Sequence, residues 1–204
     1  MVHYILMETL RPKDKKAKIL DIAFKLFRKH GYHGTGLNKI LQLSNTGKSQ
    51  LYHYFDSKQD LTRHVLQAYA ERILQETALF MNHIESLDEF EKLIDGSLKL
   101  VQTSNEICGC LVGSICAELA TSDEIIRVEI SHIFEKWKNL FSRGLTRLQA
   151  KGLLKAEADT EAIAEHFLIT AQGAFLMAKA NKDLSIVRKT FLQAIQYIKS
   201  YAST

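Results

Sequence analysis

Three consecutive side chains, Lys48, Ser49 and Gln50, are of the types that form hydrogen bonds with the bases of DNA. Glutamine can pair with adenine through two hydrogen bonds, and lysine can donate to O6 and N7 of guanine. Proteins often present such residues at the start of a short helix that enters the major groove. Because the turn formers Thr46 and Gly47 precede Lys48, we expect a helix to begin here and these three side chains to face base edges.

A second group of side chains is suited to bind the DNA backbone. Hydroxyl groups and cations supply many contacts with phosphate oxygens, and a helix start adds a favourable dipole. The alternative for His53, Tyr54 and Lys58 is simple exposure on the surface, and the alternative for Tyr52 is packing in the core. Phe55 is expected in the core. The expected phosphate contacts are Thr35, Tyr52, His53, Tyr54 and Lys58.

These residues fall in a pattern of one longer helix and two short ones. Apolar residues recur at helical spacing from Lys15 to His30, and Gly31 is typical of a helix end. Short helical patterns follow at 37–41 and 51–55, and turn formers occupy 44–47 between them. Two short helices behind a longer one form a helix-turn-helix, which is a DNA-binding arrangement.

The end of this segment resembles the signature of the TetR family of bacterial transcription regulators. It has Leu-Tyr-His-Tyr-Phe at 51–55, followed by Ser57-Lys58 and Leu61. Two positions depart from the family pattern, because Gly36 and Gly47 stand where Ser or Thr is common. The resemblance covers about a quarter of the chain in its N-terminal part.

The resemblance implies a protein that is not an enzyme and has no catalytic residues. It implies a three-helix helix-turn-helix DNA-binding domain over residues 1–60 and a helical ligand-sensing and dimerisation domain over residues 61–204. The expected partners are double-stranded operator DNA and a second copy of the chain. No cofactor is expected.

The rest of the chain also has helical patterns, so the expected fold class is all-α. The sequence has one proline, Pro12, and a chain without later prolines permits long helices. Ser57 is expected to cap a helix, with Asp60 at its third position. The expected later helices are Ser57–Phe80, Leu87–Ser104, Cys110–Ala120, Ser122–Leu148, Thr160–Ala180 and Asp183–Tyr201.

Charge is distributed unevenly along the 204 residues. Residues 1–65 contain 12 Lys and Arg against 5 Asp and Glu, whereas the remainder contains 15 against 18. A basic N-terminal part on a slightly acidic body is typical of a protein whose one end meets phosphates. We find no signal peptide and no apolar run long enough to span a membrane, so a cytoplasmic protein with reduced thiols is expected.

Three cysteines lie close together, at positions 108, 110 and 116. The Gly-Cys-Leu segment around Cys110 resembles a subgroup of the family, some of whose members respond to electrophiles or oxidants. Cys110 is therefore a possible sensor, and Lys179 is a possible neighbour that favours its thiolate. A buried thiol that only packs in the core is the alternative. A disulfide between Cys108 and Cys110 is geometrically poor, and the segment lacks the ligands and spacing of a metal site.

The body also suggests a ligand cavity and a dimer interface. Cavity residues are expected among Tyr69, His132, Trp137, His166, Gln172 and Phe175, each of which is alternatively a core residue. By resemblance, the last two helices pair with their copies in a four-helix bundle, and internal packing of their apolar faces is the alternative. The expected interface residues are Phe167, Ala171, Ala174, Ala178, Phe191, Ala194, Ile195 and Ile198.

These features together predict a repressor that leaves its operator when a small molecule binds or when a thiol is modified. An orphan regulator or activator without a small-molecule input is the first alternative. An enzyme with Cys110 as nucleophile is the second, and the sequence shows no accompanying base or oxyanion-binding group.

Overall fold

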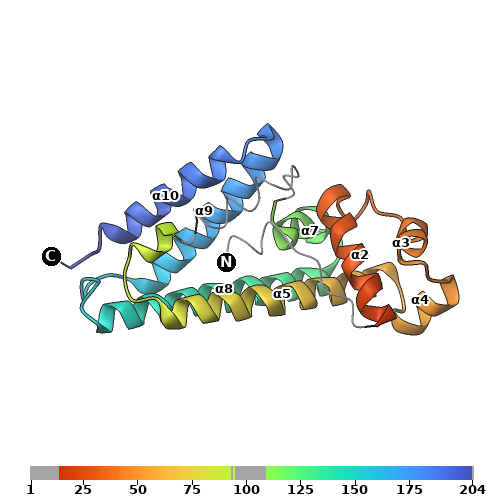
Figure 1. Cartoon of the computed structure of the whole chain (residues 1–204), viewed down its shortest axis with the longest axis horizontal. Coiled ribbons are helices and arrows are strands. Elements are labelled where there is room, and N and C mark those ends of the chain that lie inside the picture. The colour runs from red at the N-terminus through yellow and green to blue at the C-terminus, as the bar shows by residue number, and fades with distance from the viewer. Residues whose placement is uncertain (1–13, 93, 95–108, 204) are drawn as a thin grey trace. The chain divides into compact units, whose positions relative to one another are not determined.

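The computed structural model describes residues 14–92, 94 and 109–203, and this part of the chain is helical (Figure 1). An isolated antiparallel bridge joins Leu154 to Ala202 near the C-terminus. The all-α expectation is confirmed. The helix expected over 87–104 falls largely outside the described residues. The helices are α2 (Lys15–His30), α3 (Leu37–Ser44), α4 (Lys48–Tyr54), α5 (Lys58–His83), α7 (Leu111–Leu119), α8 (Glu124–Ala150), α9 (Thr160–Asn181) and α10 (Ser185–Lys199).

The described residues group into two compact units. The head unit contains residues 14–71 and 110–131, and the body unit contains residues 72–92, 94, 109 and 132–203. The head unit therefore includes α7 and the first residues of α8, in addition to the helices that the sequence places in the DNA-binding part. The functional division at residue 60 stays a prediction, whereas the packing unit is larger than residues 1–60.

The head unit is built around α2, which packs against α3, α4 and α7 (Figure 1). The Asp14 side chain caps α2 by accepting a hydrogen bond from the backbone of Ala17. Ile40 and Leu51 are fully buried in the core of this unit. At the start of α5, Ser57 Oγ accepts from the Asp60 backbone at 3.0 Å, which confirms the expected cap.

The body unit contains the adjacent helices α9 and α10, which pack together along their lengths (Figure 1). The Asp159 side chain caps α9 by accepting from two backbone N–H groups. Arg147 of α8 donates to the carbonyl oxygens of Met81 at 2.5 Å and Ile84 at 3.0 Å, so it holds the C-terminal end of α5. Among the described helices, none has both the length and the apolar character that a membrane crossing requires.

Candidate functional site

Helix α4 presents a polar face and anchors itself by two apolar residues. Leu51 and Phe55 are at most 1% exposed, so they fix one side of the short helix in the head core. Of the side chains expected to meet bases, Lys48 and Ser49 are exposed and Gln50 is half-buried. This exposure is what contact with a base edge requires. The contact itself stays a prediction.

Three of the expected phosphate contacts also lie at the surface. Tyr52 is 44% exposed and is therefore outside the core, which was its alternative place. The ammonium of Lys48 lies 6.0 Å from the centre of the Tyr52 ring. His53 is exposed and Tyr54 is half-buried, with their ring centres 5.1 Å apart. Phe55 lies in the core, as expected.

The Thr35 side chain has a local role in the structure, and its expected phosphate contact stays a prediction. Thr35 is 2% exposed, and its hydroxyl donates to the carbonyl oxygen of Gly31 at 2.7 Å. The hydroxyl hydrogen is thus used inside the turn between α2 and α3, and burial separates it from a phosphate. A threonine in a polar turn is as easily a local backbone partner as a DNA contact, and the sequence does not separate the two roles.

Lys58, another expected phosphate contact, also interacts within the head unit. Its ammonium donates to the carbonyl oxygen of Tyr32 at 2.6 Å and lies 4.1 Å from the centre of the Tyr32 ring. Partial burial lowers the pKa of Lys58, while the nearby Glu118 carboxylate opposes that change. A phosphate would have to compete with these interactions, and the phosphate contact of Lys58 stays a prediction.

Glycine occupies the N-cap positions of both short helices, as the departures from the family pattern suggested. Gly36 precedes α3 and Gly47 precedes α4, and neither helix has a side-chain hydrogen bond at its cap. A Cβ atom at either glycine would meet nothing within 4 Å. Packing therefore does not require glycine at these two positions.

Cys110 lies in the head unit at the N-cap of α7 and is 3% exposed. Cys110 and Cys116 both carry reduced thiols. The helix starts at Leu111, one residue after the expected start. Lys179 is exposed on α9 of the body unit. Its proposed pairing with Cys110 stays a prediction, and Cys108 lies outside the described residues.

The residues expected at the dimer interface are buried within a single chain, and their place in an interface stays a prediction. All of them are at most 6% exposed. Phe167 shows why: its ring stacks on Phe141 with centres 4.4 Å apart and meets Phe191 edge-on at 5.5 Å. The buried set is Phe167, Ala171, Ala174, Ala178, Phe191, Ala194, Ile195 and Ile198.

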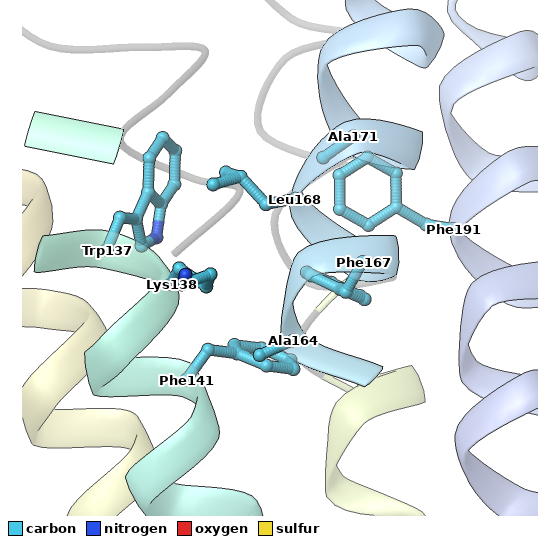
Figure 2. A pocket seen from close by; sticks show the side chains of 8 residues that line it. All are labelled: Trp137, Lys138, Phe141, Ala164, Phe167, Leu168, Ala171 and Phe191. Carbon is cyan, nitrogen blue, oxygen red and sulfur yellow. The ribbon is translucent and has the colours of Figure 1, made fainter. Parts of the chain in front are cut away.

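Part of this buried set lines an apolar pocket in the body unit. Figure 2 shows the pocket walls, which come from α8, α9 and α10, with Trp137 and Leu168 facing each other. The polar group in the lining is Lys138, which pairs with Glu135 at 3.2 Å; this hydrogen bond raises the pKa of Lys138. The lining residues are Trp137, Lys138, Phe141, Ala164, Phe167, Leu168, Ala171 and Phe191.

The sequence found one of these pocket residues, Trp137, among its expected cavity residues. His132 and His166 are exposed, and Tyr69 packs against Phe24 in the head unit with ring centres 5.3 Å apart. Phe175 is buried but is not in the lining. An aromatic residue in an amphipathic helix has the same sequence pattern whether it packs in a solid core or lines a cavity. The sequence therefore did not identify the other residues that line the pocket.

Two family models match the chain and together cover most of it. Residues 19–65 match the model described as bacterial regulatory proteins, tetR family. Residues 86–191 match the model described as transcriptional regulator LmrA/YxaF-like, C-terminal domain, and this match spans just over half of the chain. The chain belongs to the TetR family. As a TetR-family protein it is a helix-turn-helix transcription regulator and not an enzyme.

Individual proteins are similar to this chain over most of its length. An uncharacterised helix-turn-helix regulator from the lacX 3′ region of Lactococcus lactis subsp. lactis is 31% identical over 91% of this chain and 93% of its own. The repressor DhaR of Mycobacterium sp. (strain GP1) is 25% identical over 81% and 82% of the two chains. The reduced form of NemR from Escherichia coli has the same fold, with a TM-score of 0.76, 21% identity and coverage of 94% and 98%.

Proposed function

We propose that this protein is a transcriptional repressor that binds operator DNA as a homodimer, with α4 of each copy in the major groove. The observation that carries the proposal is the presentation of α4: two buried anchors, Leu51 and Phe55, hold a helix whose Lys48 and Ser49 are exposed and whose Gln50 is half-buried. A relative, DhaR, is named a repressor. Because a bacterial operator is part of the chromosome, the proposed repressor would act in the cytoplasm.

The homodimer is proposed through an apolar strip on the outer face of α9. Ile169 and Leu176 are 66% and 67% exposed, and Met177 is 52% exposed. Gly173 lies between them at helical spacing, and a Cβ atom there would meet nothing within 4 Å. Exposed apolar residues that gather on one helix face favour association, and a small residue lets two helices approach closely. A dimer also supplies the two half-site contacts that specific binding needs.

Release from the operator is proposed to follow either the binding of a ligand in the body unit or the modification of the Cys110 thiol. The apolar pocket, which Lys138 also lines, has room for about one water molecule, so an apolar ligand is proposed to enter it by displacing the lining side chains. Alternatively, the Cys110 thiolate adds to an electrophile and remains covalently bonded to it through sulfur. Lys179 is the proposed cation that favours the thiolate. The position of Cys110 at the start of α7 favours a thiolate, whereas its 3% exposure limits access.

Binding of the purified protein to DNA tests the proposal. Fluorescence anisotropy would compare a labelled duplex from upstream of the coding region with a shuffled duplex of equal length and composition. We expect strong preference for the upstream duplex, and its loss in the double variant K48A/Q50A. Lys155→Ala removes an equal charge from an exposed position in the body unit and is the matched control. Equal binding of the two duplexes by the unmodified protein would contradict the proposal.

The thiol route has its own test. The protein would be treated with N-ethylmaleimide while bound to the upstream duplex, and release would be followed by anisotropy. We expect release from the unmodified protein and retention by Cys110→Ser, with Cys116→Ser as the control because Cys116 is half-buried on the same helix. Full release from Cys110→Ser would reject the thiol route and leave the pocket as the proposed input.

A further inference from the structure

The turn after α2 is closed by a carboxylate from a distant part of the chain. The backbone N–H groups of Tyr32 and His33 donate to the two oxygens of Glu118, at 3.0 Å and 2.9 Å. Glu118 lies near the C-terminal end of α7, in the same head unit. Hydrogen bonds to an ionised acceptor are stronger than neutral ones, so this single side chain contributes much of what holds the turn.

The fit between Glu118 and the turn depends on a glycine. Gly31 has a φ of +74°, which side-chain-bearing residues rarely adopt. A Cβ atom at Gly31 would also lie only 2.2 Å from Oε1 of Glu118 and 2.9 Å from its carboxyl carbon. The carboxylate therefore occupies the space that an ordinary side chain would need. The glycine permits both the backbone turn and the close approach of Glu118.

The same turn is held from a second direction by the start of α5. The carbonyl oxygen of Tyr32 accepts from the Lys58 ammonium at 2.6 Å and from the Thr35 backbone at 3.2 Å. Lys58 lies close enough to Glu118 for the two charges to interact. The backbone of Tyr32 is thus bonded to α7 through its N–H and to α5 through its carbonyl group.

This arrangement fixes both ends of the segment that carries the two short helices. The segment from Gly36 to Ser57 contains α3 and α4, and it ends directly before Lys58. Thr35, which directly precedes the segment, and Lys58, which directly follows it, both donate to the Tyr32 carbonyl oxygen. We therefore expect a change in the turn to move the start of the segment relative to its end and to change the direction in which α4 points.

We propose that Glu118 is a positioning residue for operator recognition, which holds the Gly31–His33 turn and thereby sets the orientation of α4. The proposal rests on the proposed DNA-binding function. Glu118 acts through the turn and not by touching a base. Because non-specific attraction depends on the number of charges near phosphates, and base contacts depend on the placement of α4, the two kinds of binding should respond differently to its loss.

The test compares Glu118→Gln and Glu118→Ala with Glu124→Gln. Glu124 is a matched control because its side chain is 72% exposed and pairs only with the neighbouring Arg127 in the contacts described for it. Affinities for the upstream duplex and for the shuffled duplex would be measured well below each variant's unfolding temperature. Circular dichroism and sedimentation would check the helix content and the oligomeric state.

We expect Glu118→Gln to lose about tenfold in affinity for the upstream duplex, because the amide can accept only one of the two N–H groups. Binding to the shuffled duplex should change less than twofold, and the control should match the unmodified protein. Unchanged preference in Glu118→Gln would overturn the proposal. Equal losses on both duplexes would also overturn it, since they would indicate a merely structural role.

A double-variant measurement separates this proposal from general damage to the turn. Gly31→Ala should cost affinity for the upstream duplex, because the new methyl group meets the Glu118 carboxylate. Glu118→Ala removes the atoms in contact, so the combined variant should lose less than the product of the two single losses. If the combined variant lost affinity by the full product of the two single losses, the proposed coupling between Gly31 and Glu118 in operator binding would be overturned. If the unmodified protein showed no preference for the upstream duplex, the DNA-binding function itself would fail, and the positioning role with it.

Discussion

At the scale of single residues, exposure separates two classes among the side chains that looked suited to DNA. Lys48 and Ser49 are accessible and Gln50 is half-buried, all at the start of α4. Thr35 and Lys58 are instead bonded to backbone carbonyl groups within the head unit. Both classes contain hydroxyl and ammonium groups, so residue type does not distinguish them. The distinction depends on where the turn after α2 brings its carbonyl oxygens.

Gln50→Ala should weaken recognition of the operator more than general binding. A bidentate base contact contributes about 1–3 kcal/mol to discrimination, so we expect a loss of about 5- to 150-fold for the upstream duplex. Anisotropy measurements with single-base variants of that duplex should find one base pair at which the altered protein no longer discriminates. An alanine variant that still discriminates at every position would show that Gln50 reads no base.

Lys58→Met should weaken operator binding without changing its dependence on salt. Each phosphate contact adds about 0.9 to the slope of log affinity against log salt concentration. Because the Lys58 ammonium is used by the Tyr32 carbonyl and ring, we expect an unchanged slope and a lower midpoint of urea unfolding. A slope that falls by about 0.9 would restore the phosphate role that the sequence first suggested.

At the scale of helices, α9 shows where sequence patterns stop being informative. One face carries Phe167, Ala171 and Ala174, which are buried within the chain, and another carries Ile169 and Leu176, which are exposed. Both faces are apolar at helical spacing, so periodicity predicts a helix correctly but cannot say which face points inward. The sequence therefore predicted the helix, and the face it offered to the dimer is the one buried within the chain. The aromatic contacts of Phe167 determine the orientation.

The outer face of α9 gives a prediction about oligomeric state. Leu176→Glu should place a charge in the dimer interface and weaken association by roughly 3 kcal/mol, or about 100-fold. Sedimentation velocity should then show monomers at concentrations where the unmodified protein is dimeric. Leu79→Glu is a suitable control, because Leu79 is 64% exposed on α5. A Leu176→Glu variant that stays dimeric would place the interface elsewhere.

At the scale of the whole molecule, features that depend on neighbouring residues could be predicted from the sequence, whereas contacts between distant residues could not. Helix ends at Gly31 and the cap at Ser57 follow from nearby residues, and the structure has both. The bond from Glu118 to the backbone of Tyr32 joins residues 86 positions apart, and nothing in the sequence near either residue indicates it. The pocket is lined by residues from three helices, so no single stretch of the sequence could identify the lining residues.

The charge distribution and the proposed dimer lead to the same expectation for the whole molecule. Residues 1–65 are basic and contain α4, so each copy should bring its positive part to one half-site. Two copies related by a two-fold axis would then cover half-sites of opposite direction, about one helical turn or a small multiple of it apart.

The central claim is that two copies of the chain place two α4 helices on one operator, and footprinting with parallel mass measurement tests it most directly. Hydroxyl-radical footprinting of the upstream duplex should show two protected segments with inverted sequence symmetry. Native mass spectrometry of the same complex should find an even number of chains on each duplex. A single protected segment occupied by one chain would contradict the account, and so would a complex without any defined protected segment.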